Sequence, residues 1–164
     1  MTDQCRECHD HRAITDKINL YAELIDTGHA REAVREVFAD DAIEDHGEGI
    51  PPCRGWDEIG AMLEQATAPF RGRMHLNTNI VIKLDEDTAT SRSYYQAIFW
   101  FDEGDDETRR LAPADWVSAG VYRDEWRRFG DGWRITTRLR RNMGLSSVVI
   151  GGRPQHLLDM RGQQ

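Results

Sequence analysis

The chain is poor in the features that mark several large classes of protein. Its three cysteines, Cys5, Cys8 and Cys53, are an odd number and do not make a disulfide framework. No apolar run approaches the roughly 20 residues of a membrane span. Residues 1–9 also lack the apolar core of a secretion signal. We therefore expect a protein of the reducing cytoplasm that makes no membrane contact.

A basic surface is missing as well. The formal net charge is −8, with 21 Lys and Arg against 29 Asp and Glu, and this balance argues against a general nucleic-acid binder. It is compatible with a small, neutral or weakly polar ligand. Bulky residues are plentiful, with five Trp, four Tyr and five Phe, so 164 residues suffice for one domain with a core and a pocket.

The spacing of apolar residues predicts helices first and strands afterwards. Helices are expected over residues 10–28, 30–38 and 57–68, and strands over residues 42–46, 74–84, 88–101, 115–129 and 133–142. Gly28 is a natural stop for the first helix. Tight turns at residues 85–87 and 130–132 make hairpins, and the acidic segment 102–113 is expected to be a solvated loop.

This order is typical of an α+β fold. Long antiparallel strands must twist, so one face of the sheet becomes concave, and the helices would cover it and leave a pocket between. We place the domain at residues 10–144, with tails at 1–9 and 145–164.

A polar row begins at His75 and alternates with apolar residues. Alternation puts His75, Asn77 and Asn79 on one face of a strand. Histidine titrates near neutral pH and can act as a general base. Asp26 lies within an otherwise apolar helix pattern, and a carboxylate that accepts the imidazole Nδ1–H fixes the tautomer and leaves Nε2 free. We predict that Asp26 and His75 meet. The alternative is a surface aspartate and a structural histidine packed in the core.

Two further side chains could act on a substrate. Tyr21 could donate a hydrogen bond to a leaving group or a carbonyl oxygen, or it could be an ordinary core aromatic. Arg138 could pair with a substrate carboxylate or with developing negative charge. Alternatively, Arg134, Thr136, Arg138 and Arg140 could form a solvent-facing stripe. We assign Arg138 to the pocket and Arg134 and Arg140 to the stripe.

Other residues allow both a functional and a structural interpretation. Asn79 could hydrogen-bond a substrate or hold a backbone turn. Tyr95, Trp116 and Tyr122 could form an aromatic wall of the pocket or belong to the core.

The N-terminal cluster Cys5, Cys8, His9 and His11 imitates two metal-binding signals. It matches a haem-attachment motif, which requires export, and it offers the ligand types of a zinc site. The spacing is cramped for one ion, so we expect a solvated tail, no metal and no cofactor. The acidic residues 102–107 do not have the spacing of a calcium loop.

Several short motifs occur in a characteristic order. They are Arg12-Ala13-Ile14, Tyr21 with Asp26, Phe38-Ala39-Asp40-Asp41-Ala42, Gly55, His75-Leu76-Asn77-Thr78-Asn79, Asp87-Thr88-Ala89-Thr90, and Gly132-Trp133-Arg134-Ile135 ending in Arg138. With them, residues 10–143 resemble the SnoaL-like branch of the nuclear transport factor 2-like superfamily. The resemblance implies a cone-shaped α+β fold, in which N-terminal helices cover a strongly curved, mostly antiparallel sheet.

Within this superfamily, the pair Asp26 and His75 is similar to that of scytalone dehydratase, hexachlorocyclohexane dehydrochlorinase and bile-acid 7α-dehydratase. The resemblance implies that the pair supplies the base for an elimination, with Tyr21 and Arg138 as pocket residues. One departure is clear. Scytalone dehydratase has a second histidine on the next strand, where this chain reads Ser93-Tyr94-Tyr95-Gln96, so its mechanism cannot be copied whole.

The expected function is therefore a cofactor-independent, dehydratase-like lyase acting on a small, largely apolar substrate. An isomerase or a polyketide-type cyclase would use the same proton abstraction. A non-catalytic binding protein, such as the small subunit of a ring-hydroxylating oxygenase, is the alternative from another class. The resemblance and the open face of the sheet favour a homo-oligomer, a trimer or a dimer.

Overall fold

The fold is α+β, as predicted, and a computed structural model describes residues 3–47, 49–101, 114–143 and 148–149. The helices are α1 (Asp3–Asp26), α2 (Ala30–Val37) and α3 (Gly55–Thr67). The strands are β1 (Phe38–Asp45), β2 (Cys53–Arg54), β3 (Phe70–Asp85), β4 (Thr88–Phe101), β5 (Trp116–Phe129), β6 (Gly132–Asn142) and β7 (Val148–Val149).

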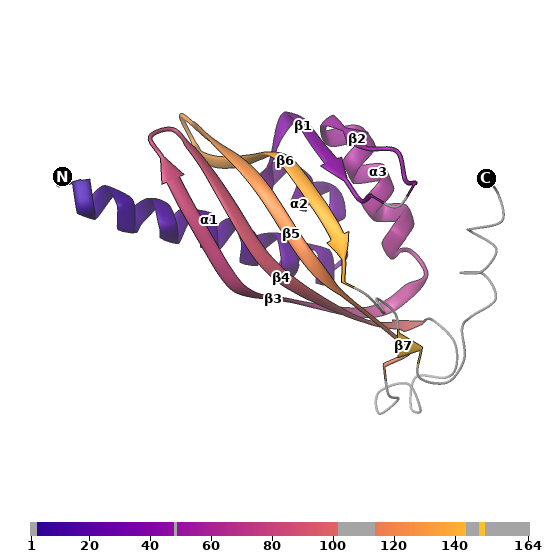
Figure 1. Ribbon diagram of the computed structural model, residues 1–164. Coiled ribbons are helices and arrows are strands. Elements are labelled where there is room, and N and C mark those ends of the chain that lie inside the picture. The colour runs from indigo at the N-terminus through magenta and orange to yellow at the C-terminus, as the bar shows by residue number, and fades with distance from the viewer. Residues whose placement is uncertain (1–2, 48, 102–113, 144–147, 150–164) are drawn as a thin grey trace.

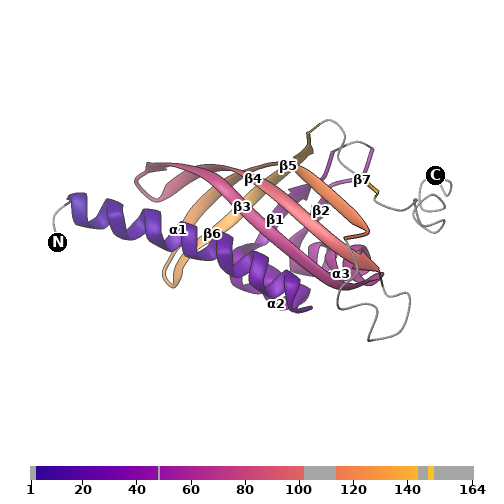
Figure 2. The ribbon, with the colours of Figure 1, turned by 90° about the horizontal axis from the view of Figure 1, so that it is seen from below.

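All of these strands belong to one twisted sheet. The strand order is β2-β1-β6-β5-β4-β3, and β7 pairs with β5. Every pairing is antiparallel except β1 with β6, which run parallel. The two predicted hairpins are confirmed: Asp85 pairs with Thr88, and Phe129 pairs with Gly132. Figure 1 shows the long strands side by side with the helices on one side of them, and Figure 2 shows the sheet curling over α1 and α2.

The sheet face that packs on the helices, here called the inner face, holds the core. Alternate residues of β4 are buried on it because successive side chains of a strand point to opposite faces. These residues are Ala89, Ser91, Ser93, Tyr95, Ala97, Phe99 and Phe101. Helix residues pack with Trp126, Trp133 and Ile135 into one cluster. A second, aromatic cluster contains Phe70, Tyr95, Phe99, Phe101 and Tyr122, with Trp116 packed against it.

Two bulges interrupt the alternation of inward and outward residues. In β3 the register shifts between Thr78 and Val81, where Asn79 has φ 51°. In β6 the bulge is at Thr136, which has no partner position on β5: Glu125 pairs with Thr137, and Trp126 pairs with Ile135. A bulge places one extra residue in one strand, which reverses the face of every residue beyond it.

Some boundaries differ from the sequence prediction. Helix α1 begins at Asp3, so most of the expected solvated tail is helical. Asp10 is buried in this segment, and its carboxylate accepts hydrogen bonds from Arg128 (2.8 Å) and Trp133 (3.1 Å). The third helix begins at Gly55, two residues before Asp57. The predicted acidic loop at 102–113 and, apart from β7, the predicted tail at 145–164 lie outside the described residues.

The outer face of the sheet exposes apolar side chains. The examples on β3 are Met74, Leu76 and Val81, with 43%, 39% and 46% of their surface exposed. The homo-oligomer stays a prediction. Within the described ranges, no helix has the length and apolar character needed to cross a bilayer.

Candidate active site

Asp26 and His75 are in direct contact. Asp26 is the last residue of α1, and Gly28, with φ 86°, then turns the chain away. The Asp26 Oδ1 atom lies 2.6 Å from His75 Nδ1. Its Oδ2 atom accepts a hydrogen bond from the His75 backbone N–H at 2.8 Å. One carboxylate therefore fixes both the strand and the imidazole ring.

This arrangement decides which ring nitrogen is free. A carboxylate accepts hydrogen bonds, so Nδ1 carries the proton and Nε2 keeps its lone pair in the neutral ring. Within the described part of the chain, Nε2 has no hydrogen-bond partner. The side chains of His75 and Asp26 are 10% and 22% exposed. The imidazole stands edge-on to Phe99, with ring centroids 5.7 Å apart.

Tyr21 is buried on α1, with only 3% of its surface exposed. Burial, with a further contribution from the Glu44 carboxylate, raises the pKa of Tyr21 well above its usual value. Burial also raises the pKa of Tyr122 to about 12. Both hydroxyls therefore stay protonated at neutral pH, and neither has a hydrogen-bond partner among the residues described. They are available as donors.

Arg138 faces the interior, as predicted, but its charge has a partner within the protein. Its Nε and Nη2 atoms donate to the Asp124 carboxylate at 2.8 and 3.0 Å. Its guanidinium carbon lies 4.4 Å from the ring centres of both Tyr21 and Tyr122. Burial acts to lower the pKa of Arg138, but the Asp124 charge outweighs burial and raises it. The Asp124 carboxylate thus neutralises the Arg138 charge that we expected to pair with a substrate.

The prediction that Asn79 shares a face with His75 is wrong. The β3 bulge turns Asn79 outward, where it is exposed. The exposed position and the φ of 51° favour the alternative that Asn79 holds a backbone turn; its role toward a substrate stays a prediction. Asn77 does share the face of His75: its Nδ2 atom donates to the Ile18 carbonyl at 3.5 Å, and its Oδ1 atom is buried without a partner.

The three predicted wall residues lie together on the inner face. Tyr95 and Tyr122 stack with ring centroids 4.5 Å apart, and Trp116 stacks on Phe99 at 5.1 Å. Their role in lining a ligand site stays a prediction.

Sequence reasoning placed Arg140 on the outside, and this was wrong. The β6 bulge turns Arg138 and Arg140 inward, while Arg134 before the bulge binds the Arg35 carbonyl at 2.7 Å. Arg140 donates to Tyr95, His46 and Ser118.

Glu44 and His46 were also missed, although a signal was available. Ala42, Glu44 and His46 alternate in the predicted strand, so the burial of Ala42 implies that the other two face inward. Glu44 is 1% exposed, and its Oε1 atom lies 3.2 Å from His46 Nε2. That approach is poorly aligned for a hydrogen bond, and Glu44 Oε2 is buried with no partner in the part of the chain that the structure describes.

Several buried polar atoms of the inner face have no partner among the described residues. They are Glu44 Oε2, His46 Nε2, Arg73 Nε, Asn77 Oδ1, Ser93 Oγ, Trp116 Nε1 and Arg138 Nη1. Leaving such an atom unpaired costs about 1–3 kcal/mol. These atoms are therefore available to a polar ligand.

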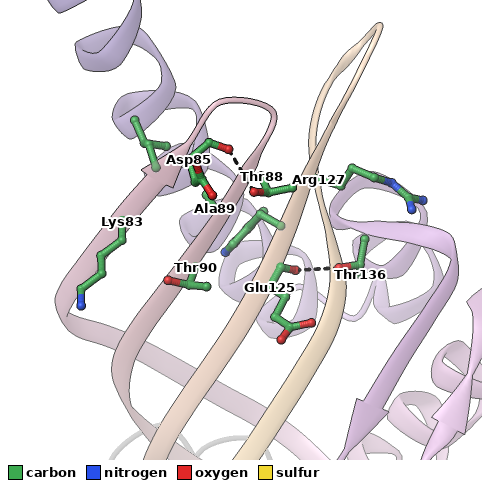
Figure 3. A pocket seen from close by; sticks show the side chains of 10 residues that line it. Lys83, Asp85, Thr88, Ala89, Thr90, Glu125, Arg127 and Thr136 are labelled. Carbon is green, nitrogen blue, oxygen red and sulfur yellow. Dashed lines mark hydrogen bonds between the residues drawn. The ribbon is translucent and has the colours of Figure 1, made fainter.

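The pocket in Figure 3 is a different feature. It lies among residues near the hairpins of the outer face, including Lys83, Thr88, Glu125 and Arg127. Two of its threonine hydroxyls are paired locally, since Thr136 donates to the Glu125 carbonyl at 3.3 Å and Thr88 to the Asp85 carbonyl at 2.9 Å. It contains neither His75 nor Asp26.

The N-terminal cysteines do not build a metal site. Cys5 and Cys8 are exposed free thiols on α1. Across residues 3–47, 49–101, 114–143 and 148–149, no group of three His, Cys, Asp or Glu side chains is placed to hold a metal ion.

Comparison with known proteins identifies the family. Residues 6–139 match the SnoaL-like domain family. The chain belongs to the SnoaL-like family. No functionally curated protein matches this SnoaL-like chain.

Solved structures agree on the fold. A protein provisionally named a scytalone dehydratase, from Novosphingobium aromaticivorans, is 24% identical, with 90% of this chain and 91% of that chain covered and a TM-score of 0.74. LinA is 18% identical, with 93% and 97% covered and a TM-score of 0.72. An NTF2-like protein with a cystatin-like fold, also from N. aromaticivorans, is 21% identical, with 94% and 91% covered and a TM-score of 0.64. The expected nuclear transport factor 2-like fold of this SnoaL-like protein is therefore confirmed.

Proposed function

We propose that this SnoaL-like protein is a dehydratase-like lyase in which His75 is the general base and Asp26 orients it. The contact between Asp26 Oδ1 and His75 Nδ1 at 2.6 Å is the observation that supports the proposal most strongly. The carboxylate holds the ring in one tautomer and stabilises the imidazolium that forms when Nε2 takes a proton. The name scytalone dehydratase, given to a structural neighbour, agrees with this chemistry.

The proposed reaction is the loss of water from a β-hydroxy carbonyl compound. His75 Nε2 removes the proton next to the carbonyl, and the electrons of that C–H bond form the new double bond as the hydroxyl leaves. The proton then passes to the departing hydroxide, so the products are an unsaturated carbonyl compound and water. General-base catalysis of this kind contributes about 10²–10⁴-fold.

Tyr21 is proposed to donate a hydrogen bond to the oxygen that gains charge. Its raised pKa keeps the hydroxyl protonated, and its hydroxyl is unpaired within the described structure. The aromatic side chains of Tyr95, Tyr122 and Trp116 favour a small, largely apolar substrate. An isomerase or cyclase would use the same abstraction and differ only in the fate of the electrons.

Proton abstraction can be tested without knowing the natural substrate. The probe is 2-tetralone, a cyclic ketone with acidic protons and no leaving group, incubated with the full chain in D₂O and followed by NMR. His75→Gln and Asp26→Asn should each slow the α-proton exchange by about 10²–10⁴-fold. Asp16→Asn is the matched control, because Asp16 lies exposed on the same helix and pairs with the exposed Arg12.

The outcomes separate the alternatives. Equal exchange rates in the wild type, His75→Gln and Asp26→Asn would exclude the pair as a base. Exchange that depends on His75, together with no dehydration of cyclic β-hydroxy ketones, would favour the isomerase or cyclase.

A further inference from the structure

Arg140 is held on the inner face by three groups that carry no negative charge. Its Nε atom donates to the Tyr95 hydroxyl at 3.0 Å, Nη1 donates to His46 Nδ1 at 3.1 Å, and Nη2 donates to Ser118 Oγ at 3.3 Å. Because a guanidinium has five N–H groups, two donors remain. The ring of Tyr95 also lies below the guanidinium, 5.1 Å from its carbon.

Arg140 therefore has no direct ion-pair partner among the described residues; the Glu44 carboxylate reaches it only through His46, whose Nε2 atom lies 3.2 Å from Glu44 Oε1. No carboxylate of the described residues lies within 4.0 Å of its guanidinium. Two other inward-facing arginines do have such partners: Arg138 pairs with Asp124 and Arg128 with Asp10. Burying a charge is unfavourable unless an opposite charge meets it, so this position is suited to an anion.

The position of Arg140 relative to His75 follows from the strand register. His75 pairs with Ala97, and Ala97 pairs with Ser118, so the three lie in one row across β3, β4 and β5. With about 4.8 Å between neighbouring strands, the backbones of His75 and Ser118 are about 10 Å apart. Between them Ala97 contributes only a methyl group; Ala97 is 3% exposed and belongs to the aromatic cluster. Two strand spacings, about 10 Å, are roughly the span of one six-membered ring with a hydrogen bond at each end.

We propose that Arg140 binds an anionic oxygen of the ligand, a carboxylate or an enolate, while the body of the ligand spans the row between Arg140 and His75. This inference rests on the proposed function in one respect, since it places the carbon that loses its proton next to His75. Ser118 and Tyr95 position the guanidinium. In the proposed reaction, Arg140 would thus stabilise the charge that proton abstraction creates on the carbonyl oxygen.

Benzoate is a suitable probe because it joins one ring to one carboxylate, and benzamide is its neutral counterpart. Binding to the full chain is measured by isothermal titration calorimetry for the wild type, Arg140→Met, Arg141→Met and His75→Gln. Arg141→Met removes the same charge from the neighbouring residue, which is exposed and pairs with Asp45. Benzoate affinity should fall by about 10–100-fold in Arg140→Met and stay unchanged in Arg141→Met, since a charge-assisted pair is lost only in the first. Benzamide should not distinguish the variants.

Equal benzoate affinity in Arg140→Met and Arg141→Met would overturn the proposal, as would a wild type that binds benzamide as well as benzoate. If Arg140→Met fails to fold, NMR of the wild type decides: the Arg140 Nε–H resonance must shift as benzoate saturates the chain, and a resonance that does not move overturns the assignment. The rate of ketone exchange in His75→Gln separates this site from the proposed function. Benzoate binding that requires Arg140, combined with ketone exchange that does not require His75, would leave the anion site intact and remove the lyase.

Discussion

Gly120 lies directly against the ring of Tyr95. A Cβ atom at position 120 would stand 2.7 Å from Tyr95 Cε1 and 2.2 Å from the Arg141 carbonyl oxygen. The missing side chain lets Tyr95 reach across β5, where its hydroxyl donates to Asn142 Oδ1 at 2.5 Å and accepts from Arg140. Gly120 thus shapes the inner face next to Arg140.

Gly120→Ala should therefore lower the free energy of unfolding by at least about 1 kcal/mol, because the added methyl group overlaps both a ring and a backbone oxygen. Urea unfolding measures the loss. Gly130→Ala is the matched control: its Cβ would meet nothing within 4 Å, and we expect no loss and a gain of up to about 1 kcal/mol. Equal stability of the two variants would show that Tyr95 can leave its place at little cost.

Asn79 should behave as a bulge residue rather than as a substrate ligand. Its φ of 51° is in the left-handed region, which asparagine and glycine tolerate and a β-branched residue does not. Asn79→Val should lose about 1–2 kcal/mol of stability in urea unfolding, while Asn79→Gly should stay close to the wild type and keep ketone exchange unchanged. Thr78→Val, at an extended outward position next to it, is the control for a β-branched side chain. A folded Asn79→Gly variant without exchange would restore the binding role.

The two bulges explain what sequence could and could not predict. The strand 88–101, both hairpins and the stop at Gly28 followed from local patterns that the structure retains. The alternation beginning at His75 also predicted the inward position of Asn77. A bulge, however, cannot be detected in the alternation of polar and apolar residues when polar residues occur on both sides of it. Asn79 and Arg140 were assigned to the wrong face for this reason, and the partner that Arg138 finds in Asp124 is set by the pairing of β5 with β6.

The pair of Arg138 and Asp124 should be sensitive to the loss of either charge. Both side chains are 1% exposed, so Asp124→Asn leaves a buried cation that lacks its anion. We expect a loss of about 3–5 kcal/mol in urea unfolding. Glu64→Gln breaks a pair with Arg31 that is about half exposed, and it should cost no more than about 1 kcal/mol. If Asp124→Asn costs as little as Glu64→Gln, another group neutralises Arg138, and Glu44, its register neighbour on β1, would be the first candidate.

Asp10 should make the stability of the fold depend on acid. The hydrogen bond from Arg128 lowers the pKa of the Asp10 carboxyl below its usual value; burial opposes this effect, and a hydrogen bond from Trp133 reinforces it. A carboxyl whose pKa is lower in the folded state stabilises the fold above the unfolded pKa near 3.8, and this contribution disappears as the pH falls through the folded pKa.

Asp10→Asn should therefore cost about 1.5–3 kcal/mol at neutral pH, because the hydrogen bonds from Arg128 lose their charged acceptor. As the pH falls from the unfolded pKa near 3.8 through the lower folded pKa, the difference from the wild type should shrink, since the wild-type carboxyl then loses its own charge. Urea unfolding of both chains at several pH values measures the difference directly, so the other carboxyl groups, which the two chains share, cancel. Asp16→Asn, at an exposed position of the same helix, should show a small difference at every pH. A penalty for Asp10→Asn that is the same at neutral and acidic pH would mean that packing, rather than the charge on Asp10, attaches α1 to the hairpin of β5 and β6.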